Sequence, residues 1–111
     1  MNKDLGKTST GMQANVEALL SYLLGVITGI IFYLIEKENK FVRFHAMQSI
    51  ITFGSLFVLQ IILIFIPFIG WILQPLVGLV SVILWILLMI KAFQGQNFKV
   101  PIAGDMAEKQ V

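Results

Sequence analysis

The chain has 111 residues, of which 58% are hydrophobic and 13% charged, and its mean hydropathy is +0.88. Because soluble domains carry roughly a quarter charged residues, this composition indicates an integral membrane protein. The formal net charge of +2 comes from cations beside apolar segments, where membrane topology explains them better than nucleic-acid binding does. Cysteine is absent, which excludes disulfides and thiolate metal sites.

Three apolar segments dominate the sequence, and each is long enough to cross the ~30 Å of a hydrocarbon core at ~1.5 Å per residue. The predicted spans are about residues 16–35, 46–66 and 71–93. They predict an all-α integral membrane protein with one three-helix transmembrane domain over residues 16–93. A polar N-terminal tail (1–15) and a C-terminal tail (94–111) are too short for a second domain, which needs ~50 residues.

The first segment has a competing interpretation as a signal peptide, because Lys3 and Lys7 precede an apolar run. The run exceeds the usual ~7–15 residues of such peptides, and no small-x-small cleavage site follows it. We therefore expect it to remain as a span. Glu17, near its start, is expected at the interface, where the helix dipole favours an anion, rather than in ion coupling.

Small residues recur every four positions in this first segment, at Ser21, Gly25 and Gly29. On one helix they share a face, and small residues allow the close backbone approach through which membrane helices associate. The ridge predicts a contact with another helix of the same chain, and a homodimer seam is the alternative.

The residues ahead of the second span mix bulky apolar side chains with cations. This pattern predicts a short segment lying in the cytoplasmic interface, with Phe41 and Phe44 in lipid and with Lys40 and Arg43 near anionic headgroups. A plain polar loop is the alternative.

The second span carries a stripe of polar residues. At ~100° per residue they fall within roughly 140° of one another. They are His45, Gln48, Ser49, Thr52, Ser55 and Gln60. Because polar groups are costly in lipid, we expect the stripe to face protein, either bonded to other helices or lining a wet path. His45 and Ser49 lack an acid or a nucleophile elbow, so we expect no catalytic, cofactor or metal site.

Cations set the predicted orientation. With three spans, one side carries only Lys3 and Lys7, and the uncharged second link at 67–71 belongs to it. The other side carries six cations: Lys37, Lys40, Arg43, Lys91, Lys99 and Lys109. Since cytoplasmic flanks retain Lys and Arg, the N-terminus is expected outside and the C-terminus inside.

The string KFVRFHAMQSI at residues 40–50, leading into a span, resembles the signature of a family of small bacterial and archaeal membrane proteins. That family is distantly related to the Tic channel-like subunit of chloroplast protein import. Its tail pattern is matched by Lys91-Ala92, Gly95 and residues 98–101, so the resemblance covers about residues 15–109. It implies functional positions at Arg43, His45 and Gln48. The import subunit has four spans, and three narrow helices cannot enclose a polypeptide, so any pore requires an oligomer.

Two functions remain open at this stage. The first is a structural or interaction component of a prokaryotic cytoplasmic membrane, assembling with itself or with a membrane protein partner. The second is a transport or channel component, working as an oligomer with a polar path along the second helix. The candidate functional or helix-contact residues are Arg43, His45, Gln48, Ser49 and Thr52.

Overall fold

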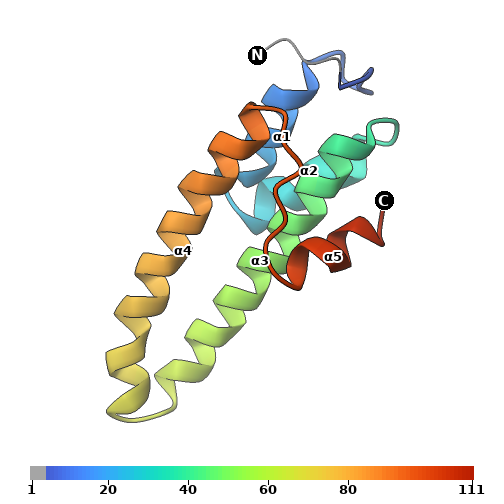
Figure 1. The fold of residues 1–111 in the computed structure, drawn as a ribbon. Coiled ribbons are helices and arrows are strands. Elements are labelled where there is room, and N and C mark those ends of the chain that lie inside the picture. Colours follow the sequence, from blue (N-terminus) through green and yellow to red (C-terminus); the bar gives the residue numbers. More distant parts are fainter. Residues whose placement is uncertain (1–4) are drawn as a thin grey trace.

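The computed structural model describes residues 5–111, and over this range it contains helices and no β-strand. The elements in chain order are α1 (Ala14–Leu23), α2 (Val26–Ile35), α3 (Lys40–Ile64), α4 (Ile69–Phe93) and α5 (Ala103–Glu108) (Figure 1). The predicted all-α class is confirmed.

Two helices are long and apolar enough to cross a membrane. They are α3 and α4, each of 25 residues, and they form an antiparallel hairpin (Figure 1). No Asp, Glu, Lys or Arg occurs between Arg43 and Lys91, so apolar residues dominate nearly the whole hairpin. Gly70 permits the tight start of α4, because a Cβ there would collide with the Leu63 carbonyl oxygen.

The first predicted span is not one helix. The chain breaks at Leu24 and Gly25 into α1 and α2, of ten residues each, and Gly25 has φ +61°, a backbone conformation that other residues rarely adopt. Ten helical residues extend ~15 Å, about half of a hydrocarbon core. Residues 16–35 therefore do not form one continuous helix, and the third predicted span is not confirmed. We refer to α1, the break and α2 as the bent helix pair.

The bent helix pair turns the chain back toward the end from which it came. In Figure 1, α1 runs beside α4, and α2 returns across α3. The break is bonded internally, since Thr28 Oγ1 accepts from the Leu24 amide (3.1 Å) and donates to the Ser21 carbonyl (3.1 Å). These bonds satisfy backbone groups that a broken helix would leave unpaired.

Three parts of the chain therefore meet at one end of the molecule. The Ser9 amide donates to Glu36 Oε1 (2.8 Å), which joins the N-terminal segment to the α2–α3 loop. Asn15 Nδ2 donates to the carbonyl of Phe93, the last residue of α4 (3.0 Å). The predicted placement of the two termini on opposite sides of the membrane assumed three crossings and is not confirmed. We call this end the polar end.

Two further expectations are corrected near the polar end. Residues 40–45 form the first turns of α3, capped by Asn39 Oδ1 on the Val42 amide (3.1 Å), so no separate interfacial segment exists. Phe44 is buried, and Phe41 packs against the core rather than into lipid. The predicted C-terminal tail folds back, and α5 contacts α3.

Candidate functional site

Three buried polar side chains form the centre of the fold. Tyr22 comes from α1, His45 and Gln48 come from adjacent turns of α3, and all three are 0% exposed. Tyr22 Oη lies 2.7 Å from His45 Nδ1, and Gln48 Nε2 donates to Tyr22 Oη over 2.9 Å. We call these three residues the Tyr22 network.

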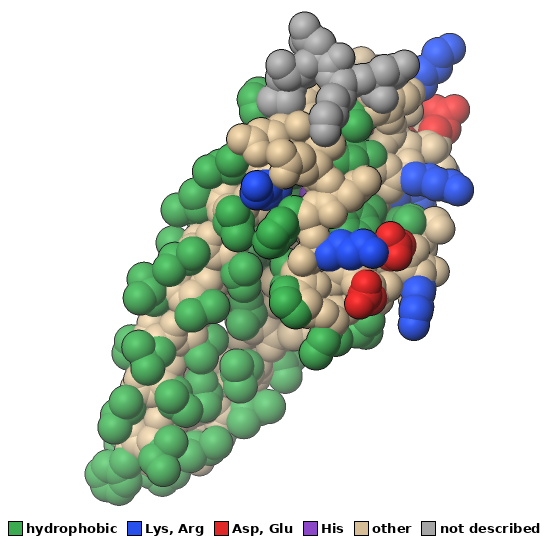
Figure 2. Space-filling view, viewed as in Figure 1, with side chains coloured by type: hydrophobic (Ala, Val, Ile, Leu, Met, Phe, Trp, Pro, Cys, Tyr) green, Lys and Arg blue, Asp and Glu red, His purple; other side chains and the backbone are tan. Residues whose placement is uncertain are grey.

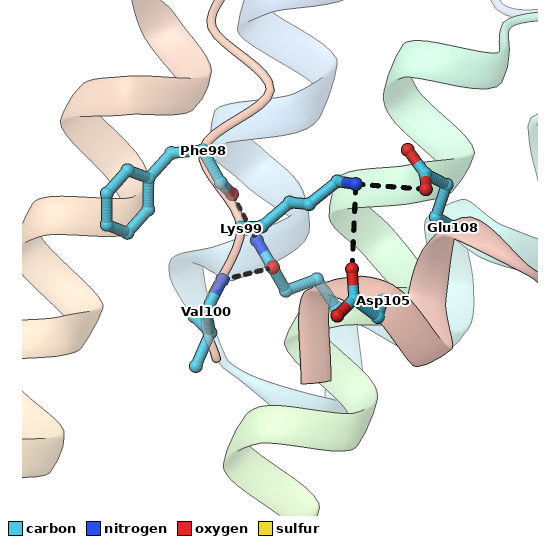
Figure 3. Close-up of polar contacts among 6 residues, drawn as sticks. Phe98, Lys99, Val100, Asp105 and Glu108 are labelled. Atoms are coloured by element: carbon cyan, nitrogen blue, oxygen red, sulfur yellow. Dashed lines mark hydrogen bonds and ion pairs between the residues drawn. The ribbon is translucent and has the colours of Figure 1, made fainter. Parts of the chain in front are cut away.

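The Tyr22 network also holds residues 96–100, which we call the C-terminal strap. Gln48 Nε2 donates to the Phe98 carbonyl (2.9 Å), and Gln48 Oε1 accepts from the Val100 amide (2.8 Å) (Figure 3). His45 Nε2 lies 2.9 Å from the Gln96 carbonyl oxygen. The strap is thus bound through its backbone, much as a neighbouring β-strand would bind it.

One assignment of protons satisfies every group in the network. The Gln96 carbonyl can only accept, so His45 Nε2 carries a proton and Nδ1 accepts from the Tyr22 hydroxyl. That hydroxyl in turn accepts from Gln48, whose second amide hydrogen reaches Phe98. A neutral imidazole completes this chain, and no N–H or O–H donor of the three side chains is left over for a substrate.

Aromatic and apolar side chains enclose the network. The rings of Phe41 and Phe44 meet the His45 ring edge-on, with centroids 4.6 and 5.1 Å apart. Trp85 Nε1 on α4 donates to the Tyr22 carbonyl (2.7 Å), so α4 is also hydrogen-bonded to α1 at this residue. Because hydrogen bonds strengthen in such low-dielectric surroundings, the network fixes α1, α3 and the strap in one arrangement.

Sequence reasoning missed Tyr22 as the residue that links the predicted His45 and Gln48. Its one signal was a phenol within an apolar segment, where a buried hydroxyl needs a partner. We expect Tyr22→Phe to lower the free energy of unfolding by about 1–2 kcal/mol, because Gln48 and His45 then each lose a bond inside the core. Thermal unfolding in detergent checks this. Tyr33→Phe is the control, since its hydroxyl bonds to an exposed carbonyl; equal losses for both variants would contradict the prediction.

The small residues of the first segment lie on both sides of the helix break rather than on one helical ridge. Ser49 Oγ of α3 donates to the Gly25 carbonyl (2.9 Å). Gly29 fits against α3 so closely that a Cβ there would lie 3.0 Å from the Ala46 carbonyl oxygen. Ser21 is buried and donates to the Glu17 carbonyl (3.0 Å). Gly25 and Gly29 thus contact α3 of the same chain.

The remaining predicted residues are divided between interior and surface. Arg43 Nη1 donates to the carbonyls of Tyr33 (3.0 Å) and Glu36 (2.8 Å), so it caps the end of α2, while Lys40 is exposed. Thr52 is buried, but Ser55 is exposed, so the polar stripe does not face protein along its whole length. Further along α3, Gln60 Nε2 donates to a carbonyl of α4 (3.1 Å).

Two carboxyl groups meet at the polar end. Glu36 accepts hydrogen bonds from the backbone amides of Ser9, Glu38 and Asn39 and from the Ser9 hydroxyl. Glu17 is buried, accepts a hydrogen bond from Thr10 Oγ1 (2.5 Å) and lies close to Glu36. Its second oxygen, Oε1, has no hydrogen-bond partner among the described residues.

Burial, together with the neighbouring Glu36 carboxyl, raises the pKa of Glu17 to about 7. Burial acts the same way on Glu36, but the neighbouring Glu17 and the hydrogen bonds from Asn39 and Ser9 outweigh it and hold the pKa of Glu36 at about 2. The pair therefore shares one proton below neutral pH. Glu17 was expected as an anion at the membrane interface, and the structure buries it.

The raised pKa of Glu17 predicts a pH-dependent stability. The folded state binds this proton more tightly than the unfolded state, so the added stability is present below the ordinary value of 4.5 and is lost as pH rises through about 7. We expect the melting temperature in detergent to fall between about pH 5 and pH 8. Glu17→Gln should flatten that fall, because an amide donates to Glu36 without titrating. Glu38→Gln, at an exposed position, is the control, and an unchanged slope in Glu17→Gln would refute the shared proton.

The chain is similar to a known protein family and to several named proteins. Residues 7–107 match the sequence model of a family described as the magnetosome magnetite crystal formation protein family. A protein of Methanocaldococcus jannaschii is 60% identical over 105 residues, covering 95% of this chain and 94% of the relative. One of Archaeoglobus fulgidus is 56% identical over 100 residues, covering 90% and 97%. Both are named as UPF0132 membrane proteins, and no solved structure matches significantly.

These relatives confirm the predicted family of small prokaryotic membrane proteins. A second protein of Methanocaldococcus jannaschii, 50% identical over 99 residues, covers 89% of this chain and 71% of the relative and carries the same kind of name. None of these descriptions is enzymatic, and none concerns chloroplast import. The distant link to the Tic channel-like subunit therefore stays a prediction.

Proposed function

The chain belongs to the magnetosome magnetite crystal formation protein family, and we propose that it is a structural and interaction component of a prokaryotic cytoplasmic membrane. Its relatives are named as membrane proteins, and the α3–α4 hairpin supplies two helices long enough to cross a bilayer. Around that hairpin, the bent helix pair and α5 form a folded unit at the polar end (Figure 1).

The closed Tyr22 network is the observation that carries this proposal. Gln48 makes three hydrogen bonds within the chain, His45 makes two, and Ser49 makes one to Gly25. A transport path needs polar groups that exchange partners with a passing solute, whereas a scaffold needs groups that hold one shape. Because these three side chains of the polar stripe form hydrogen bonds within the chain, they suit a scaffold and argue against the alternative of a wet path.

Charge distribution supports a specific orientation. Hydrophobic side chains cover the α3–α4 hairpin, and charged side chains gather toward the polar end (Figure 2). Since cytoplasmic surfaces retain Lys and Arg, we place the polar end, with both termini, in the cytoplasm and the α3–α4 turn outside. This replaces the orientation expected from three spans.

The family description concerns magnetite crystals, and a mineral surface calls for several free carboxylates together. Here Glu17 and Glu36 are buried, and Asp105 and Glu108 both pair with Lys99, at 3.6 and 2.9 Å. Among residues 5–111, no three His, Asp or Glu side chains come together. The property that we carry over is therefore the membrane location named for the relatives, rather than contact with a crystal.

Reconstituted liposomes test the choice between scaffold and transporter. We expect purified protein to produce no more ion or solute flux than empty liposomes. Crosslinking in cells from a photoreactive residue at the exposed position Glu38 should give one discrete protein adduct, either with a second copy or with a partner. Flux that rises with protein content and disappears in Thr52→Val would overturn the scaffold proposal, because valine keeps the shape and removes only the hydroxyl.

A further inference from the structure

A cavity of about 310 Å³ lies between α3, α4 and the C-terminal segment. Every residue that lines it is apolar except Thr52 and Ser55 of α3. The apolar lining includes Ile51 of α3, Leu84 of α4, Val100 of the strap and Met106 of α5. Neither the Tyr22 network nor the carboxyl pair contributes to this lining.

Thr52 is the anomalous residue in the cavity. It is only 5% exposed, yet its Oγ1 has no hydrogen-bond partner among the described residues. Hydroxyls within helices commonly donate to the carbonyl one turn back, as Ser21 does to Glu17 (3.0 Å) and Ser81 does to Val77 (2.7 Å). An unpaired hydroxyl in apolar surroundings is unfavourable. Thr52 therefore brings a buried, unpaired hydroxyl to the wall of the cavity.

The position of the cavity along α3 indicates what surrounds it. One turn nearer the polar end, Gln48 binds the strap. Lys99 of the strap forms ion pairs with Asp105 and Glu108, which suit lipid headgroups and water (Figure 3). The cavity lining itself includes Ile102, 76% exposed, and Met106, 49% exposed, which suit hydrocarbon. In the orientation proposed above, on which this step rests, the cavity lies near the boundary between headgroups and acyl chains, where the linkage oxygens of glycerolipids are found.

We propose that this cavity binds one hydrocarbon chain of a membrane glycerolipid, with the ester or ether oxygen of that chain accepting a hydrogen bond from Thr52 Oγ1. The volume is at the lower limit of small-molecule pockets, ~300–1,000 Å³, and suits one chain rather than a whole lipid. Lys99 is already paired with two carboxylates, so a free fatty acid or a phosphate finds no unpaired cation there. A neutral linkage oxygen needs none.

Photoaffinity labelling of the full chain in phospholipid vesicles tests this site. The probe is a phosphatidylglycerol that carries a diazirine on the first carbons of one acyl chain, and its adducts are mapped by mass spectrometry. We expect adducts to concentrate on Thr52, Ser55 and Leu84. Thr52→Val should reduce them at least threefold, as should Ser55→Phe, which fills the cavity. Ser81→Ala is the matched control, because that hydroxyl is already bonded to Val77, and it should leave labelling unchanged.

Two results would overturn the proposal. Adducts spread evenly along α3 and α4 and insensitive to Thr52→Val would show ordinary surrounding lipid. Displacement of the probe by an isoprenoid quinone or a free fatty acid, but not by excess unlabelled glycerolipid, would show a different occupant. Thr52→Val is nearly isosteric, so the test remains decisive even if Ser55→Phe fails to fold.

Discussion

Gln48→Leu is expected to lower the free energy of unfolding by about 3–5 kcal/mol. The substitution removes all three hydrogen bonds of the amide, and it leaves the Phe98 carbonyl and the Val100 amide without their α3 partner. Tyr22 Oη also loses its donor within the core. Each buried group left unpaired costs ~1–3 kcal/mol, which outweighs the gain from a more apolar side chain.

Two measurements check the expected loss of stability in Gln48→Leu. Thermal or denaturant unfolding in detergent gives the change in stability, and limited trypsin digestion at Lys99 reports release of the strap. Gln96→Ala is the matched control, because that side chain is exposed and only its backbone carbonyl bonds to His45. If Gln48→Leu costs less than ~1 kcal/mol and leaves cleavage at Lys99 unchanged, Gln48 does not hold the strap.

Gly29→Leu should destabilise the protein by about 3 kcal/mol or more, because it overfills the contact between α2 and α3. The first added carbon alone would lie 3.0 Å from the Ala46 carbonyl oxygen and 3.2 Å from Ser49 Cβ. The carbonyl belongs to the α3 backbone and moves only with the helix. Leucine favours helix over glycine by up to ~1 kcal/mol, so the measured loss reports the clash rather than helix propensity.

Gly54→Leu provides the control for Gly29. A Cβ at Gly54 meets only Val26 Cγ2, at 3.8 Å, and the position borders an open groove with Ser55 and Val58. We expect this variant to keep at least the wild-type stability in detergent. If Gly29→Leu instead changed only the oligomer distribution, with stability intact, the glycine would belong to a homodimer seam rather than to a contact within the chain.

Sequence reasoning predicted the helical class and the α3–α4 hairpin because both follow from composition. A predominantly apolar stretch without Asp, Glu, Lys or Arg between Arg43 and Lys91, divided by one turn, has few ways to cross lipid. The first segment was mispredicted because hydropathy sums side chains and does not register a single backbone angle. At Gly25 that angle divides one expected span into two short helices.

The site was harder to predict than the fold. Periodicity placed His45, Gln48, Ser49 and Thr52 on one face, and the structure buries all four. Their main partners, Tyr22 and the strap at residues 96–100, lie on segments that reach α3 only because the chain doubles back twice. No local pattern encodes that proximity. The functional roles of these residues stay predictions.

The central claim is that the bent helix pair returns the N-terminus to the side that holds the α2–α3 loop and the C-terminus. Single cysteines at the exposed positions Gln13, Glu38, Gln96 and Phe68 test it directly in a chain without native cysteine. In intact cells, a membrane-impermeant maleimide should label Phe68→Cys at the α3–α4 turn, and should label Gln13→Cys, Glu38→Cys and Gln96→Cys only after permeabilisation. Labelling of Gln13→Cys from outside, with Glu38→Cys and Gln96→Cys protected, would contradict the claim and restore a third crossing.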